Sequence, residues 1–295
     1  MRDLTNDILE LIRRTSTDLP PDVEQALGAA RQRETQGSAA RGALDTILEN
    51  VTLARRDSSP ICQDTGTPIF IVRYPAGWST RALRAQIREA IAQATKKAYL
   101  RPNAVDSLSG KNSGNNLGDD TFPTIYFEEV EGKTLTIDLL LKGGGSENVC
   151  AQYSLPHTGL GAGRDLEGVR RVVLDAVHQA QGQGCAPGVL GIAIGGDRGS
   201  SYMASKEALL RPLDDVNPDR ALADLEARIL RETNELGIGP MGFGGKTTVL
   251  GVKACGLHRL PASFFVSVSY MCWACRRRRM IADGDAVRYS DRSEP

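Results

Sequence analysis

The chain contains 295 residues, and its 36 Lys and Arg residues are balanced by 36 Asp and Glu residues, giving a formal net charge of zero. This balance leaves no overall field to recruit nucleic acid or an anionic membrane, so any anion must be bound locally. No apolar run approaches the roughly 18 residues that a membrane-spanning helix needs, and the charged N-terminus does not resemble a signal peptide. We therefore expect a cytoplasmic protein that binds neither nucleic acid nor membrane.

Residues 1 to 58 carry apolar side chains at helical spacing and predict a helical N-terminal region. Pro20-Pro21 interrupts this pattern, and the stretch Ala39 to Arg56 continues it. A strand is expected at Ile69 to Val72, followed by a helix with one apolar face. That face consists of Leu83, Ile87, Ile91 and Ala94.

Residues 102 to 120 are rich in Asn, Ser, Gly and Asp, which favours a surface loop, although long ordered loops beside a cleft are the usual exception. The runs Thr124 to Val130 and Thr134 to Leu141 follow, separated by Glu131-Gly132-Lys133, and predict a β-hairpin. Three glycines, 143 to 145, come next. Their N–H groups can form a concavity for a carboxylate or phosphate, and a flexible turn explains them equally well.

The second half of the chain alternates helices and apolar strands, which is typical of an α/β protein. Its predicted elements are a helix at 165–181, a strand at Val189–Ile194, a glycine loop at 195–201, helices at Tyr202–Leu210 and Asn217–Glu235, and strands at Val249–Lys253 and Phe264–Tyr270. We expect an α/β fold in which a mixed sheet is flanked by helices. Residues 1–280 would form one continuous unit, and residues 281–295 a loose polar tail.

Two clusters invite functional interpretations that we reject. The glycine-rich segment 237–248 contains a Gly-Lys-Thr, but a P-loop needs Gly where Pro240 stands, and β-branched residues follow where a helix should begin. Nucleotide binding is therefore not expected. The four arginines at 276–279 are too few to indicate nucleic acid, and we expect them to form a solvated face.

The stretch Cys62 to Thr67 places a thiol, an amide, a carboxylate and a hydroxyl in a segment that Gly66 and Pro68 should turn sharply. Taken alone, it fits a reactive site and a small buried cysteine equally well. Six cysteines in a cytoplasmic chain indicate reduced thiols or metal ligands instead of disulfides. Cys272 and Cys275 form a Cys-x-x-Cys, but structural zinc needs a second pair. Solitary cysteines at turns and strand ends suit an iron–sulfur cluster held at three corners, with its fourth iron open as a Lewis acid.

Six motifs, in the family's order between about residues 5 and 280, resemble class I fumarate hydratases and the related L-tartrate dehydratases. They are Cys62-Gln63-Asp64-Thr65-Gly66, Leu100-Arg101-Pro102-Asn103-Ala104-Val105, Gly143-Gly144-Gly145-Ser146-Glu147, Cys185-Ala186-Pro187, Gly195-Gly196-Asp197 and Cys272-Trp273-Ala274. The resemblance covers the first of two modules. In this family the second is either fused on or supplied as a separate β-subunit, so the chain resembles the free α-subunit of a hetero-oligomer.

The resemblance implies a 4Fe-4S cluster and the reversible addition of water across the double bond of a dicarboxylate. The implied cluster ligands are Cys62, Cys185 and Cys272, and the implied packing cysteines are Cys150, Cys255 and Cys275. Gln63, Arg101 and Gly145 match positions that bind the substrate carboxylates. Asp64 matches a catalytic carboxylate that activates a threonine of the β-subunit, so the chain alone is expected to be inactive.

Fumarate and (S)-malate are the expected substrate pair, with L-tartrate and a methylated fumarate as alternatives. A non-catalytic iron–sulfur or redox-sensing protein that uses Cys272 and Cys275 as a thiol switch is an alternative of another class. One departure from the family pattern concerns its usual histidine, because that position is Leu260 here while His258 stands two residues earlier. His258 either takes over that role or is a structural residue.

Overall fold

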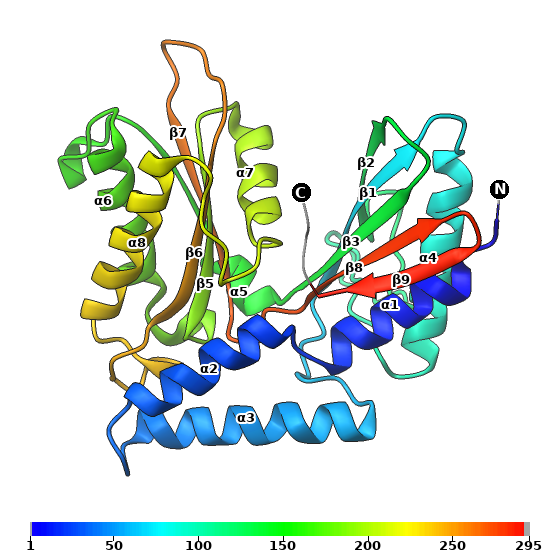
Figure 1. The fold of residues 1–295 in the computed structure, drawn as a ribbon, viewed down its shortest axis with the longest axis horizontal. Helices are drawn as coiled ribbons and strands as arrows, with labels where there is room; N and C mark the ends of the chain where they lie inside the picture. The colour runs from blue at the N-terminus through cyan, green and yellow to red at the C-terminus, as the bar shows by residue number, and fades with distance from the viewer. Residues whose placement is uncertain (1, 292–295) are drawn as a thin grey trace. The chain divides into compact units, whose positions relative to one another are not determined.

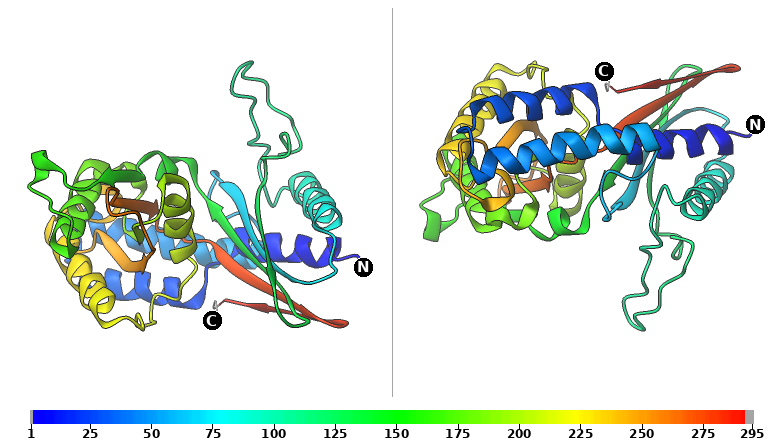
Figure 2. Two further views of the ribbon diagram at one scale, coloured as in Figure 1. Left: turned by 90° about the horizontal axis from the view of Figure 1, so that it is seen from above. Right: turned by 90° about the horizontal axis from the view of Figure 1, so that it is seen from below.

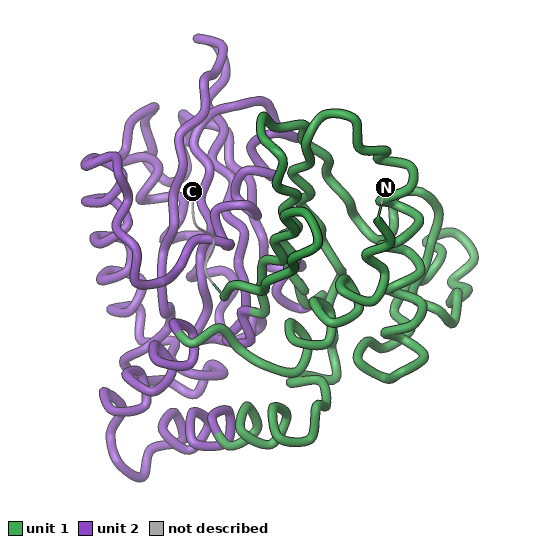
Figure 3. Tube along the Cα trace, turned by 45° about the vertical axis from the view of Figure 1, so that its right-hand side comes forward, with its two compact units in different colours: residues 1–21, 49–144, 276–295 green, residues 22–48, 145–275 purple. Residues whose placement is uncertain are grey.

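The computed structural model describes residues 2–291. The chain divides into two compact units, which Figure 3 shows in different colours. The first unit comprises Met1–Pro21, Glu49–Gly144 and Arg276–Pro295, and the second comprises Asp22–Leu48 and Gly145–Cys275. The sequence predicted one continuous unit. Each unit combines segments that are distant in the sequence, so no single linker in the sequence marks a boundary between the units.

The predicted helical N-terminal region is confirmed as α1 (Thr5–Thr17), α2 (Pro21–Arg33) and α3 (Ala39–Asp57). In the first unit, α1 packs against α4 (Thr80–Lys96), the helix predicted from its apolar face. Ser79 begins α4 as an N-cap, because its side chain accepts a hydrogen bond from the N–H of Ala82. Among residues 2–291, none of the helices combines the length and hydropathy that a bilayer crossing requires.

The first unit contains a five-stranded sheet in the order β2-β1-β3-β8-β9 (Figure 1). Its strands are β1 (Thr67–Pro75), β2 (Thr124–Val130), β3 (Leu135–Lys142), β8 (Arg277–Asp283) and β9 (Ala286–Ser290). Alternate residues of β1, β3 and β8, such as Phe70, Leu139 and Met280, join the side chains of α1 and α4 in one buried core. The sheet and its two helices thus form the body of this unit.

The predicted hairpin of β2 and β3 is wrong, because β1 lies between them. β1 pairs in parallel with β2, where Ile69 is opposite Thr124, and antiparallel with β3, where Phe70 is opposite Leu139. β1 is buried for most of its length and takes the interior position, whereas β2 has many exposed residues and suits an edge. The short connection 131–134 therefore crosses over one strand, a span of about 9.6 Å.

The expectations for the C-terminal segment also need correction. β8 and β9 pair antiparallel, so residues 281–290 form a hairpin and not a loose tail, whereas residues 292–295 lie outside the described part. The four arginines are not a solvated face, since Arg276, Arg277 and Arg278 are 1%, 2% and 9% exposed. Arg277 and Arg278 lie in β8, an interior strand between β3 and β9, and Arg276 directly before it accepts a hydrogen bond at its carbonyl oxygen from the N–H of Leu141 at 3.0 Å.

The second unit contains a four-stranded sheet in the order β4-β7-β5-β6. Its strands are β4 (Ala151–Ser154), β5 (Gly188–Ile194), β6 (Val249–Gly256) and β7 (Phe265–Met271), and its helices are α6 (Leu166–Ala180), α7 (Arg198–Ala208) and α8 (Arg220–Glu235). β5 runs parallel to β6 and antiparallel to β7. Both sheets of the protein are therefore mixed and flanked by helices, which confirms the predicted α/β class. The remaining helical turns are α5 (Gly144–Asn148) and the 3₁₀ turns Thr158–Leu160, Gln181–Gly184 and Pro240–Gly242.

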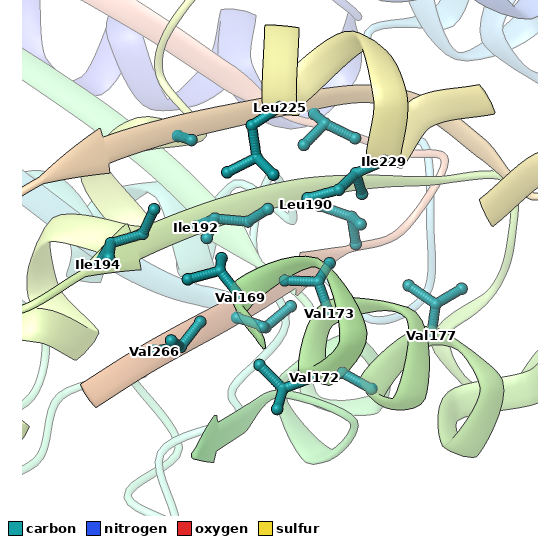
Figure 4. Close-up of a cluster of buried hydrophobic side chains, with 14 of the residues drawn as sticks. Val169, Val172, Val173, Val177, Leu190, Ile192, Ile194, Leu225, Ile229 and Val266 are labelled. Atoms are coloured by element: carbon teal, nitrogen blue, oxygen red, sulfur yellow. The ribbon is translucent and has the colours of Figure 1, made fainter. Parts of the chain in front are cut away.

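Helices cover β5 on both faces. On one face, valines of α6 and apolar residues of α8 pack against the β5 side chains, as Figure 4 shows for Val173, Ile229 and Ile192. On the other face, α7 lies close enough for the hydroxyls of Ser205 and Ser269 to share a hydrogen bond of 2.7 Å. Gly191 allows this approach, because a Cβ there would stand 2.0 Å from the carbonyl oxygen of Ser205.

The Gly-Lys-Thr segment of the second unit binds a carboxylate of the chain itself. Glu34, only 4% exposed, accepts hydrogen bonds from the N–H of Lys246 at 2.9 Å and from the N–H of Thr247 at 2.8 Å. These are the N–H groups that a phosphate-binding loop would direct at its ligand. The glycine loop therefore binds Glu34, the residue that follows α2, and so holds the end of this helix in place.

Candidate functional site

The stretch from Cys62 to Thr67 forms one wall of a pocket in the first unit. The pocket has a volume of about 430 Å³, and its lining residues are Gln63, Asp64, Gly66, Thr67, Arg101, Asn103, Phe122 and Gly144. Gly66 makes the sharp turn possible, because its φ is +81° and a Cβ there would lie 2.8 Å from the backbone of Lys142. The fold thus brings together three predicted site residues, Gln63, Asp64 and Arg101.

The carboxylate of Asp64 is held at both oxygens by backbone groups. Oδ1 accepts a hydrogen bond from the N–H of Gly66 at 3.0 Å, and Oδ2 accepts one from the N–H of Gly144 at 2.7 Å. Gly143 lies against the same oxygen, since a Cβ there would be 3.0 Å away. The concavity predicted for the glycine run therefore receives the chain's own carboxylate at Gly144. Gly145, the third glycine, belongs to the second unit.

Arg101 lines the same pocket and is exposed. Its Nη1 donates a hydrogen bond to the carbonyl oxygen of Gln63 at 3.3 Å, and its backbone N–H donates to Oγ1 of Thr65 at 3.0 Å. Asn103 donates from Nδ2 to the same hydroxyl oxygen at 3.3 Å. Sequence reasoning did not assign roles to Thr65 and Asn103, although both stand inside the recognised motifs.

Arg276 is a further cationic group that sequence reasoning missed. Its side chain is among the largest fully buried ones, and within the described residues 2–291 its Nε and Nη1 have no hydrogen-bond partner. The position of a Cβ on Gly143 would be 3.8 Å from Nη2 of Arg276 and 3.0 Å from Oδ2 of Asp64. A buried guanidinium therefore lies behind the glycine that borders the Asp64 carboxylate.

The cysteines predicted as ligands form no disulfide within residues 2–291, and each is half-buried. In the second unit, Cys185 and Cys272 belong to adjacent backbone segments, because the N–H of Trp273 donates to the carbonyl oxygen of Cys185 at 3.1 Å. Burial raises the pKa of the Tyr270 hydroxyl well above its usual value, and the neighbouring thiols of Cys272 and Cys185 raise it further. Cys62 belongs to the first unit.

No three His, Cys, Asp or Glu side chains within residues 2–291 form a group that would hold a metal ion by themselves. The ligand set of Cys62, Cys185 and Cys272 therefore stays a prediction.

The other cysteines occupy packing positions. The thiol of Cys150 donates to the carbonyl oxygen of Ser146 at 3.3 Å, and Cys275 is fully buried. Burial raises the pKa of the Cys255 thiol to about 11, which keeps this group protonated and unreactive near neutral pH.

Leu260, which occupies the position of the family histidine, and His258, the alternative to it, lie in the segment after β6. The carbonyl oxygen of His258 accepts a hydrogen bond from the N–H of Gly196 at 3.2 Å, and Leu260 is 74% exposed. This backbone contact gives no catalytic role to the His258 side chain.

Comparison with known proteins gives one family. The family model described as Fumarate hydratase (Fumerase) matches residues 5–281. A putative fumarate hydratase class I of Geobacillus stearothermophilus is 53% identical over 280 residues, which are 94% of this chain and 54% of the relative, so the chain spans about half the length of that protein. A putative L(+)-tartrate dehydratase subunit alpha of Methanocaldococcus jannaschii is 35% identical over 93% of this chain and 95% of its own length. The L(+)-tartrate dehydratase subunit alpha of Escherichia coli K12 is 30% identical, with coverages of 96% and 91%.

Proposed function

The chain belongs to the fumarate hydratase (Fumerase) family, and we propose that it is the cluster-binding α-subunit of a hydro-lyase that interconverts fumarate and (S)-malate. The observation that carries the proposal is the pocket of the first unit, which combines Gln63, Asp64 and Arg101. A cation, an amide and a carboxylate in one cavity fit a small dicarboxylate and a proton-transfer group.

Arg101 and Gln63 would bind a substrate carboxylate. The guanidinium of Arg101 is planar and presents parallel N–H groups that match the two oxygens of a carboxylate. Its bond to the carbonyl oxygen of Gln63 engages Nη1 and ties the guanidinium to the residue that would share the substrate. The backbone of Gly145 is proposed as a third contact to the same anion.

Asp64 would serve the proton transfer. Its two oxygens are fixed by the N–H groups of Gly66 and Gly144, so the carboxylate has a defined orientation before any substrate arrives. Such fixed placement favours proton exchange with a partner in hydrogen-bond reach. We propose that this partner is a threonine of a separate β-subunit, which Asp64 activates as the base.

The proposed cofactor is a 4Fe-4S cluster ligated by Cys62, Cys185 and Cys272. Three partly exposed cysteines that form no disulfide within residues 2–291 fit a cluster held at three corners. When bound, the cluster would supply a Lewis acid at its unligated iron. Cys275 is fully buried and is not proposed as a ligand.

A partner is proposed because the chain corresponds to one part of a larger enzyme. It covers 54% of the Geobacillus relative but 91% and 95% of the two proteins named as alpha subunits. The missing β-subunit would complete a hetero-oligomer, and we expect no turnover without it. The higher identity to the putative fumarate hydratase favours fumarate, and L-tartrate is the second candidate because the alpha subunits carry that name.

The ligand proposal is tested by iron and sulfide analysis of protein purified without oxygen. We expect about four irons per chain and their loss in Cys62→Ser, Cys185→Ser and Cys272→Ser, while the matched control Cys275→Ser keeps them. Iron that depends on Cys275 instead of Cys272 would contradict the ligand set.

The substrate proposal is tested on the chain assembled with its β-subunit. We expect kcat/KM to be higher for fumarate than for L-tartrate, and Arg101→Ala to abolish most of the activity. Faster turnover of L-tartrate would refute the fumarate assignment, and full activity of Arg101→Ala would refute the carboxylate-binding role.

A further inference from the structure

We infer that Thr65 is a positioning residue, whose hydroxyl fixes Arg101 and Asn103 against the loop that carries Gln63 and Asp64. This inference rests on the proposed function for the role of Arg101 toward substrate. It explains why a threonine stands in the middle of the Cys62 stretch although its side chain is fully buried.

The geometry places one hydroxyl oxygen between two walls of the pocket. Oγ1 of Thr65 accepts a hydrogen bond from the N–H of Arg101 at 3.0 Å and another from Nδ2 of Asn103 at 3.3 Å. Thr65 follows Asp64 directly in the chain, and all the other residues named here line the pocket. The backbone of Arg101 is therefore held next to the residue that follows Asp64, and this hydroxyl fixes where the Arg101 side chain begins.

The segment after Arg101 needs such an anchor, because it begins a long irregular stretch. Residues 97–123 contain no helix or strand, and Figure 2 shows them extending well beyond α4 in both views. The stretch returns to its origin through Asn116, which is fully buried and accepts a hydrogen bond at Oδ1 from the N–H of Asn103 at 3.2 Å. Asn112 adds a bond from Nδ2 to the carbonyl oxygen of Pro102 at 2.6 Å. Hydrogen bonds of Asn116 and Asn112 thus hold this irregular stretch to Asn103 and Pro102, next to the pocket.

A different explanation is that Thr65 is only a buried hydroxyl with satisfied hydrogen bonds. That explanation predicts a loss of stability on substitution and nothing specific at Arg101. Our inference predicts a local loosening of Arg101 as well, and a substrate affinity that follows it. The two explanations therefore differ in readouts other than stability.

The first test is hydrogen exchange of the Arg101 amide in the full chain. Thr65→Val keeps the shape of the side chain but accepts no hydrogen bond, so we expect exchange at Arg101 to rise by about tenfold or more. Thr65→Ser retains the hydroxyl and should return the exchange close to that of the original protein. Thr15→Val is the matched control, because Thr15 in α1 is 1% exposed and its hydroxyl donates a hydrogen bond to the carbonyl oxygen of Leu11, far in the sequence from Arg101. Unchanged exchange in Thr65→Val, or an equal rise in Thr15→Val, overturns the inference.

The second test uses the cluster-loaded assembly with the β-subunit. We expect Thr65→Val to raise KM by about tenfold with a smaller change in kcat, and Thr65→Ser to restore KM. An unchanged KM alongside an altered kcat overturns the positioning of Arg101. If the assembly of the original chain hydrates neither fumarate nor L-tartrate, the proposed function fails, and the exchange experiment still decides the role of Thr65.

Discussion

Arg276, directly before β8, and Arg279, within β8, should respond differently to the same substitution. Arg279 donates two hydrogen bonds to Asp138, from Nε at 2.7 Å and from Nη2 at 2.8 Å, and Asp138 is 1% exposed. Arg276 is also 1% exposed, but its Nε and Nη1 have no hydrogen-bond partner among residues 2–291. Methionine has a similar length and no charge, so Arg279→Met and Arg276→Met compare a guanidinium that is paired with a carboxylate and one with two unsatisfied nitrogens.

The expected magnitudes follow from what each substitution leaves behind. Removing one partner of a buried ion pair costs about 3–5 kcal/mol, because the other charge stays buried. Arg73 still donates to Asp138 at 3.1 Å, so we expect the lower end, about 3 kcal/mol, for Arg279→Met. A buried polar group without a partner carries a penalty of about 1–3 kcal/mol. Arg276→Met removes that penalty and should leave the free energy of unfolding unchanged or raise it by about 1–2 kcal/mol.

Urea denaturation followed by circular dichroism measures both effects as shifts of the midpoint at constant slope. We expect the midpoint to fall for Arg279→Met and to stay or rise for Arg276→Met. Equal destabilisation by the two substitutions would refute the reasoning, because Arg276 would then have a stabilising partner in solution. A gain in stability accompanied by a loss of activity would identify Arg276 as a charge that the fold retains for the Asp64 site.

Three further predictions concern other contacts. Glu34→Gln should lower the free energy of unfolding by about 1–3 kcal/mol in urea denaturation, since a charged acceptor of two backbone N–H groups is lost; an unchanged midpoint would contradict this. Gly66→Ala should cost about 2–3 kcal/mol and disturb the pocket, because its φ of +81° and the Lys142 backbone both oppose a Cβ; Gly77→Ala, with φ +85° and open space around it, separates the strain from the contact. Hydrogen bonding by Arg13 lowers the pKa of Glu10 from 4.5 to about 2, so its contribution is present above pH 4.5 and lost as the pH falls toward 2. Glu10→Gln should therefore lower the free energy of unfolding at pH 7 by about 0.5 kcal/mol, which thermal denaturation detects as a lower melting temperature. The difference in melting temperature between the variant and the original protein should vanish as the pH falls below about 2. A difference that does not depend on pH would exclude the Glu10 carboxylate as its cause.

The spacing of apolar residues predicted most of the helices and strands. It did not predict which strands pair, because pairing depends on segments that are distant in the sequence. The helix with Leu83 and Ile87 follows from apolar spacing alone, because a helix closes its hydrogen bonds within itself. The partner of β2 does not follow from spacing, since a strand pairs with whichever apolar strand takes the interior, and here that is β1. The prediction that the arginines at 276–279 form a solvated face failed for the same reason. Only the order of the strands shows that β8, which begins at Arg277, is an interior strand.

The candidate site divides in a similar way. Gln63, Asp64 and Arg101 came from the resemblance of local motifs, and the fold places all three in one pocket. Asn116 could not be found from the sequence, because its contact with Asn103 exists only after the intervening residues fold back. Arg276 could not be found either, since a run of arginines gives no sign that one of them is buried.

Both units contain a glycine-rich turn whose N–H groups bind a carboxylate from elsewhere in the chain. In the first unit, Gly144 donates to Asp64, and in the second, Lys246 and Thr247 donate to Glu34. The sequence signal is the same in the two cases, because glycines leave backbone N–H groups accessible for an anion. What separates them is access: Glu34 is 4% exposed, whereas Asp64 lines a pocket of about 430 Å³ beside Arg101. A carboxylate that is fixed by backbone groups and still faces a cavity can exchange protons with a ligand, while one that is fixed and enclosed can only stabilise the fold. The exposure of the bound carboxylate, which depends on the three-dimensional structure, therefore supports the proton-transfer role proposed for Asp64 and a structural role for Glu34.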